Sequence, residues 1–268
     1  MIFSAYSDIR NMVIMHPRPN IMIVFICSTL AMCMGFKTSP AIQETSIHDG
    51  QNPVPYLCEK AREGRLILLG TRHDNKSMHN LIAGALPQLV KDAGVNTLFL
   101  EIPSKEQANI NRFLAGKAEI ADICMWKIVS CNDYCKIILK ARELGMKVVA
   151  MDNDEDPCIT RDRWMAVHVA DYLGANPGTR GMVVVGNCHV LKNIRWANEE
   201  GLSLADYLNG YNTFSILMWA GAIDCDCPHA VNVDPKTFRG VKDPTLQSMN
   251  LHPQTSLANT ADGVIFLP

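Results

Sequence analysis

The sequence predicts an α/β protein with a mostly parallel central sheet and helices on both faces. From residue 65 onward, strand-like apolar runs alternate with helix-like segments, and this alternation is typical of crossover units. Two of the apolar runs end in the same Gly-x-x-His tetrad, at residues 70–73 and 186–189. Since the carboxyl ends of parallel strands share one edge of a sheet, we expect both histidines at that edge.

Short apolar runs predict the strands, in chain order, over residues 65–69, 97–100, 148–151, 182–185, 214–219 and 264–267. Apolar residues at three- and four-residue steps predict the helices between them, over residues 78–90, 105–144, 160–173 and 202–208. Gly94 ends the first helix, Gly116 interrupts the second, and Thr160 can cap the third. Residues 228–260 are rich in Pro, Asn, Gln and Thr and are predicted to form a wrapping loop.

The chain of 268 residues is long enough for a single α/β domain, which we place at 65–268. Residues 1–41 are predicted to be a signal peptide or N-terminal anchor, and residues 42–64 an extended lead-in. The run 21–36 carries no charge and is shorter than the roughly 20 residues of a membrane-spanning helix. It therefore favours a secretory signal, hence a secreted or periplasmic protein, with membrane association through a retained anchor as the alternative.

Composition excludes one class of partner and leaves the cysteines open. The net charge of −2 provides no basic surface for a phosphate backbone, so we expect no nucleic-acid partner. Two of the ten cysteines fall in the predicted signal. The other eight can pair in an oxidising compartment or serve as small buried hydrophobic residues.

Polar residues follow each of the first four predicted strands: His73, Glu101, Asp152 and His189. Two imidazoles and a carboxylate can hold a divalent transition metal such as Mn, Co, Zn or Fe, which activates a bound water. The metal ligands would be His73, Glu101 and His189. The same three residues can also work without metal, with one histidine as a general base oriented by Glu101. The residues alone leave both alternatives open.

Glu101 follows so apolar a strand that its carboxylate needs a partner. Arg161 and Arg163 are the candidates. Cys188, beside His189, is a candidate thiol nucleophile, although a cysteine in such a place is more often a buried small residue. Arg72, beside His73, would oppose a metal ion if it pointed inward and would suit an anionic substrate or a haem propionate.

The order of these motifs resembles the Tiki/TraB/ChaN superfamily, which is related to the erythromycin esterases. The matching segments are Gly70-x-x-His73, residues 98–101, Arg161-Asp162-x-x-Met165-Ala166, Gly186-x-x-His189 and residues 262–266. The resemblance implies a fold like that of EreA and ChaN, with His73, Glu101, Arg161 and His189 as the functional set. It spans metal-dependent proteases, metal-free esterases, haem-uptake lipoproteins and toxin domains.

From these observations we predict an exported hydrolase that cleaves an ester or amide in a small-molecule or peptide substrate. A metal-dependent peptidase is one form of this prediction. The alternatives are a non-catalytic protein that binds haem or iron for uptake, and a secreted effector or toxin-like domain.

Overall fold

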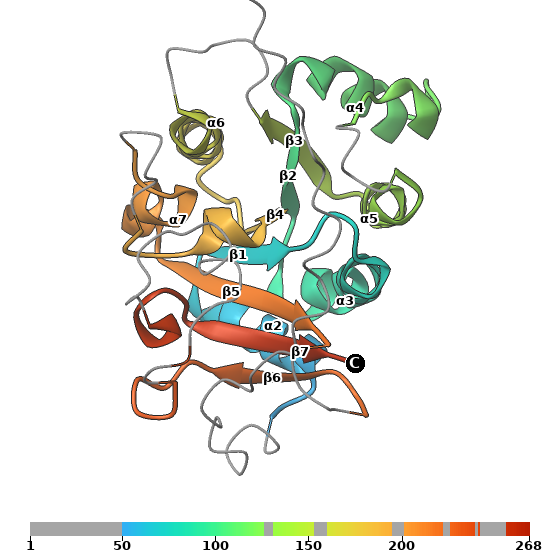
Figure 1. Ribbon diagram of the computed structural model, residues 1–268. Coiled ribbons are helices and arrows are strands. Elements are labelled where there is room, and N and C mark those ends of the chain that lie inside the picture. The colour runs from blue at the N-terminus through green and yellow to red at the C-terminus, as the bar shows by residue number, and fades with distance from the viewer. Residues whose placement is uncertain are drawn as a thin grey trace, which may run out of the picture. The chain divides into compact units, whose positions relative to one another are not determined.

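The computed structural model describes residues 50–125, 131–152, 160–194, 201–221, 226–238, 241 and 256–268. They form a seven-stranded sheet in the order β3-β2-β4-β1-β5-β7-β6 (Figure 1). The strands are β1 (Leu66–Thr71), β2 (Thr97–Pro103), β3 (Lys147–Asp152), β4 (Gly181–Gly186), β5 (Thr213–Ala220), β6 (His229–Asn232) and β7 (Gly263–Leu267). All pairs are parallel except β6 with β7. The predicted mostly parallel α/β fold is confirmed.

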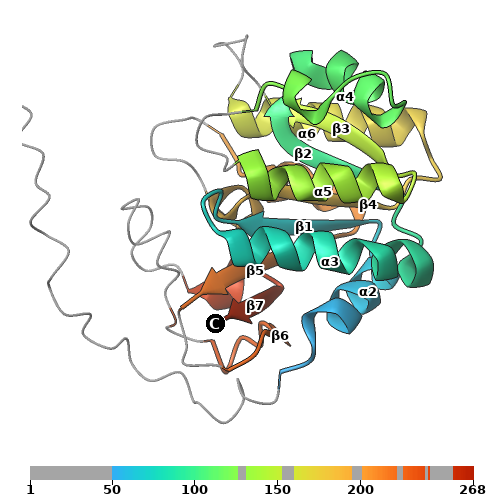
Figure 2. The same cartoon turned by 90° about the vertical axis from the view of Figure 1, so that its right-hand side faces the viewer.

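Helices cover both faces of the sheet. They are α2 (Pro53–Glu63), α3 (Lys76–Ala93), α4 (Gln107–Leu114), α5 (Cys131–Glu143), α6 (Arg161–Ala175) and α7 (Leu204–Tyr207). Residues of α2, α3, α4 and α5 pack in one hydrophobic core, and residues of α6 and α7 pack in a second core on the opposite face. Figure 2 shows α3 and α5 crossing the first face.

The strand β1 explains why the strands of this sheet appear in the sequence as unbroken apolar runs. Ile67 and Leu69 belong to one core, while Leu66 and Leu68 belong to the other, because successive side chains of a strand point to opposite faces. All four are fully buried, and burying each such side chain contributes about 1.5–3 kcal/mol. A polar residue in such a strand is therefore tolerated only at its end.

The connection from β1 to α3 holds the first tetrad histidine in place. The side chain of Asn75 caps α3 by accepting the Met78 N–H at 3.0 Å. At the other end Gly94 adopts the left-handed conformation (φ 68°) that glycine reaches without strain. His73 thus lies in a short connection between two fixed elements.

Two elements differ from the sequence prediction. Within the lead-in predicted to be extended, residues 53–63 form the helix α2, which begins with Pro53 and is capped by Asn52. Its apolar face is narrow, and the burial of Tyr56 and Leu57 against the sheet, rather than a local pattern, holds it. The predicted wrapping loop contains β6, a four-residue strand that forms the edge of the sheet and is stabilised mainly by antiparallel pairing with β7.

The predicted signal peptide or anchor over residues 1–41 lies outside the described residues. Within the described part of the chain, no helix has the length and apolar character needed to cross a membrane. Four of the described cysteines, Cys58, Cys124, Cys188 and Cys227, are free thiols.

Candidate active site

The polar residues that follow the strands meet around the carboxyl group of Glu101. Its side chain is 2 % exposed. His73 Nε2 lies 3.3 Å from Glu101 Oε2, and His189 Nε2 lies 3.7 Å from Oε1. Arg161 Nη2 donates to Oε1 at 2.6 Å. The structure therefore brings the four predicted site residues together, while their chemical roles stay predictions.

An irregularity in β2 places Glu101 there. β2 pairs with β4 only from Thr97 to Leu100, and its register with β3 shifts between Leu100 and Pro103. Glu101 lies in this stretch, where the backbone N–H of Gly186 donates to its Oε2 at 2.7 Å. A carboxylate, instead of a strand carbonyl, thus satisfies the last amide of β4.

Glu101 is a carboxylate throughout the neutral range. Burial by itself would raise its pKa, but the hydrogen bond from His73 and the positive charges of His189, His73 and Arg161 outweigh burial and lower the pKa to about 2. So acidic a group is a weak proton acceptor at neutral pH. It therefore acts on its neighbours as a fixed negative charge that stabilises the positive groups around it.

Arg161, the first residue of α6, makes a two-point contact with a second acid. Its Nε donates to Asp152 Oδ1 at 2.7 Å and its Nη2 to Oδ2 at 2.6 Å. Asp152 ends β3 and is fully buried. Burial opposes the charge of Arg161, but the hydrogen bonds to Asp152 and the charge of Glu101 raise its pKa further. Arg163, the other candidate for Glu101, is exposed.

His189 is fixed by an acid to which sequence reasoning assigned no role. Its Nδ1 pairs with a carboxylate oxygen of Asp162, and both side chains are buried. Burial lowers the pKa of His189, but the charges of Asp162 and Cys188 outweigh it and raise the pKa well above the usual value. Asp162 lies in the first turn of α6, where the helix dipole favours a negative charge. Its place beside Arg161 was the available sequence signal.

His73 has far fewer contacts. Its side chain is 19 % exposed, and its Nδ1 is buried with no hydrogen-bond partner among the described residues. Among the described residues, Glu101 is the acid that lies within ion-pair distance of the His73 ring. The neighbouring cation, Arg72, pairs with Asp74 at 3.0 Å with both side chains largely exposed, so its charge is directed away from the imidazole.

The two tetrad glycines are needed for close approach, and neither adopts a positive φ. A Cβ on Gly70 would lie 2.6 Å from Asn187 Oδ1, and one on Gly186 would lie 3.2 Å from His73 Nε2. Asn187 in turn donates to the Met218 carbonyl at 3.1 Å, which ties the second tetrad to β5.

The donor set does not fit a resident metal ion. Both oxygens of Glu101 already accept an N–H, and the guanidinium of Arg161 and the protonated His189 would repel a second cation at that carboxylate. In the described ranges, no three His, Cys, Asp or Glu side chains are grouped to hold a metal. The metal-bound alternative, with Mn, Co, Zn or Fe, thus finds no support in this geometry.

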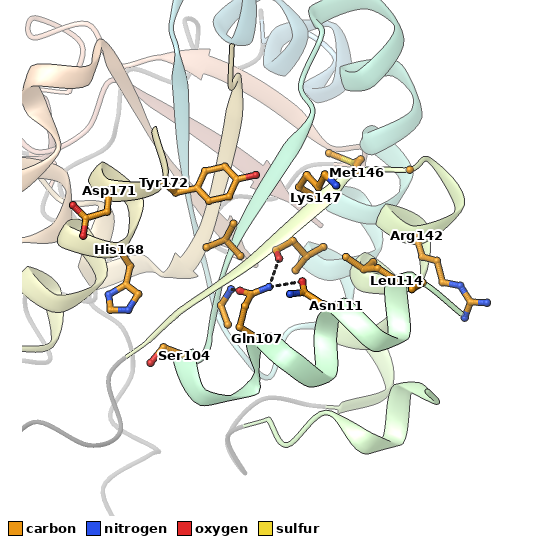
Figure 3. Close-up of a pocket in the computed structure, with 15 residues that line it drawn as sticks. Ser104, Gln107, Asn111, Leu114, Arg142, Met146, Lys147, His168, Asp171 and Tyr172 are labelled. Carbon is orange, nitrogen blue, oxygen red and sulfur yellow. Dashed lines mark hydrogen bonds between the residues drawn. The ribbon is translucent and has the colours of Figure 1, made fainter. Parts of the chain in front are cut away.

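A separate cavity of about 860 Å³ lies along the edge strand β3, beside α4 and α6 (Figure 3). The side chain of Gln107 lies on its floor, donating to the Val148 carbonyl at 2.9 Å and accepting the Ala150 N–H at 2.8 Å. This amide therefore substitutes for a neighbouring strand. The charged residues of the cavity are exposed, and none of the four site residues lines it.

No protein-family model matches the chain, and no curated protein matches it either. Several solved structures do match its fold. A mutant of erythromycin esterase EreC in its open conformation has a TM-score of 0.55 and 11 % identity, covering 80 % of this chain and 93 % of that chain. The type III effector HopBA1 has a TM-score of 0.54 and 14 % identity, covering 81 % of this chain and 93 % of that chain.

The fold is therefore one that an esterase and an effector share, and at such identities the likeness concerns the fold alone. ChaN of Campylobacter jejuni, in a structure of cofacial haem binding, has a TM-score of 0.48 and 11 % identity, with 79 % of this chain and 90 % of that chain covered. That similarity is too low to support a ligand. Membership of the Tiki/TraB/ChaN superfamily stays a prediction.

Proposed function

We propose that this chain is a hydrolase that cleaves an ester or amide bond at the Glu101 site without a resident metal ion. One observation carries the proposal: a buried, permanently ionised carboxylate contacts a guanidinium and two imidazoles with unlike surroundings. Such a combination of a partly exposed imidazole with buried positive groups suits acyl transfer, which needs a proton acceptor and stabilisation of an oxyanion.

His73 is the candidate general base. Its ring is partly exposed, and its Nε2 faces the site. Its Nε2 donates to Glu101 Oε2 at 3.3 Å, so the nitrogen that can take a proton from an attacking water is Nδ1, which has no hydrogen-bond partner among the described residues. Glu101 stabilises the imidazolium that forms. General-base catalysis of this kind contributes about 10²–10⁴-fold to the rate.

His189 and Arg161 are the candidate groups for the negative charge that develops on the substrate oxygen. Both place nitrogen atoms beside Glu101 Oε1, and Asp162 and Asp152 hold them there. His189 also has a proton to give to the leaving group. Removing one stabilising donor of this kind costs about 10²–10³-fold in kcat.

The test is hydrolysis of p-nitrophenyl butyrate and of its anilide counterpart by the purified full chain in excess EDTA. We expect turnover to persist in EDTA and to fall about 10²–10³-fold in His73→Gln. His168→Gln is the matched control, because His168 lies on α6 with its Nδ1 against the Trp164 carbonyl at 3.1 Å. Turnover that EDTA abolishes and a transition metal restores, or no turnover by the wild-type chain, would overturn the proposal.

The remaining alternatives have their own readouts. A Soret band that forms on adding haem and is lost in His73→Ala, in a chain that turns over no ester, would favour the haem-binding alternative. Export, and with it an effector-like role, depends on residues 1–41. N-terminal sequencing of protein from its native cell tests it, with a start near Ile42 expected.

A further inference from the structure

We propose that Cys188 is the nucleophile of this site and that hydrolysis passes through a thioester on its sulfur. The inference rests on the proposed hydrolase function and names the group that attacks the substrate first. Cys188 lies in the short 3-10 helix Asn187–Val190 that directly follows β4, between Gly186 and His189.

The sulfur shares a small space with both imidazoles. A carbon in the Cβ position of Gly186 would lie 3.2 Å from His73 Nε2, 3.6 Å from His189 Cδ2 and 3.8 Å from Cys188 Sγ. All three side chains therefore border one point above the end of β4. Cys188 is a free thiol and partly exposed, whereas Glu101 is buried, so a substrate that arrives from solvent meets the sulfur before the carboxylate.

Cys188, His189 and Asp162 have the arrangement of a nucleophile, its base and the acid that orients the base. Asp162 holds Nδ1 of His189, so Nε2, which also lies 3.7 Å from Glu101 Oε1, is the nitrogen that a neighbouring sulfur would use. The hydrogen bond and charge of Cys188 are among the causes that raise the pKa of His189, after the opposing effect of burial and the charge of Asp162. A thiolate beside an imidazolium is the reactive form of cysteine.

The first chemical step forms the thioester. The Cys188 thiolate attacks the substrate carbonyl carbon, a C–S bond forms, and the carbonyl electron pair moves to oxygen near Arg161 and His189. When the pair returns, the bond to the leaving alcohol or amine breaks, and the leaving group takes the proton from His189 Nε2.

The second step releases the acid. His73 takes a proton from water at Nδ1, the hydroxide attacks the thioester carbon, and the C–S bond breaks to restore the thiolate. The proton on His73 then passes through solvent to His189. One water is consumed and one acid and one alcohol or amine are formed, so atoms and charges balance.

Alkylation of the wild-type chain tests the reactive thiol without any variant. With substoichiometric iodoacetamide we expect Cys188 to be modified before Cys124, although Cys124 is the more exposed thiol, and turnover of p-nitrophenyl butyrate to fall in step with that modification. Asp162→Asn should slow the alkylation of Cys188 about tenfold while leaving Cys124 unchanged. Equal or slower alkylation of Cys188 in the wild-type chain would overturn the inference.

Trapping of the intermediate tests the nucleophile itself. Acid quenching during turnover should leave one butyryl group on the peptide that contains Cys188, and Cys188→Ala should lower kcat about 10³-fold. Cys124→Ser is the matched control and should retain full turnover. A Cys188→Ala variant that hydrolyses the ester at the wild-type rate rejects this inference alone, whereas a wild-type chain without turnover rejects the proposed function.

Discussion

The two Gly-x-x-His segments have the same spacing and end neighbouring strands, yet their histidines lie in different surroundings. His189 is buried, and Asp162 pairs with its Nδ1. His73 is partly exposed, and its Nδ1 has no partner among the described residues. The comparison teaches that the motif places an imidazole at the sheet edge, while the acids around each ring decide whether it is held as a cation or left with an open ring nitrogen.

The site around Glu101 and the cavity along β3 differ in how their charged residues are buried. The cavity offers about 860 Å³, but its charged residues are exposed. Around Glu101, by contrast, the side chains of Glu101, Asp152, Asp162 and His189 are all buried and paired. Perturbed charge rather than volume marks the place where chemistry is expected.

The largest effect is expected from the group that both histidines share. Glu101→Gln keeps the shape but removes the charge that stabilises both imidazoles and Arg161, so kcat should fall by at least about 10³-fold. Glu106→Gln is the matched control, because Glu106 is also a buried glutamate but bonds to Asn109 and to the Cys124 N–H. Ester hydrolysis by the two variants checks this, and equal losses in both would contradict it.

Removing the cation between the two acids should cost stability as well as activity. Arg161→Ala leaves Glu101 and Asp152 buried and unpaired, so we expect about 2–3 kcal/mol of destabilisation, less than a fully buried pair would lose because the arginine is about one-third exposed.

Two variants sharpen that prediction. Arg161→Lys should restore part of the stability but not the two-point contact with Asp152. Arg163→Ala should be silent, since Arg163 is exposed. Thermal melting compares all three, and a damaging Arg163→Ala beside a silent Arg161→Ala would show that the wrong arginine has been assigned.

A methyl group at the second tetrad glycine should disturb His73 more than His189. In Gly186→Ala the new Cβ would lie 3.2 Å from His73 Nε2, so the ring must shift, and we expect kcat to fall about tenfold. Gly174→Ala in α6 meets nothing within 4 Å and should stabilise the protein by about 0.5–1 kcal/mol. Turnover and melting temperature are measured together, and unchanged kcat in Gly186→Ala would contradict the close approach.

The smallest expected effect is on the pH dependence of folding stability, and it tests the charge of His189. Its pKa is raised in the folded chain, so the stability it contributes is fully present below its unfolded value of 6.5 and is lost as pH rises through the folded value. Asp162→Asn should therefore lose less stability than the wild type as pH rises above the unfolded value of 6.5. Denaturant titrations across that range check the slope, and parallel pH profiles would contradict the ion pair.

Much of this arrangement was predictable because it depends on local patterns. Buried parallel strands are continuous apolar runs, and polar residues directly after them must meet at one edge, which is how His73, Glu101 and His189 were found. The pairing of Asp162 was not predictable, because it depends on which way the first turn of α6 faces. The same holds for Gly186, whose N–H is free for Glu101 because β2 pairs with β4 only as far as Leu100.

The central claim is that Asp162 holds His189 as a cation in the resting site, with a proton ready for the leaving group, whereas His73 has no such acid on its Nδ1 and serves as the base. NMR of the ring nitrogens of His189 in the wild-type chain at about pH 7 tests it most directly. The account predicts that both ring nitrogens carry a proton and that Asp162→Asn removes one of them. A neutral His189 ring in the wild-type chain, with one nitrogen unprotonated, would contradict it.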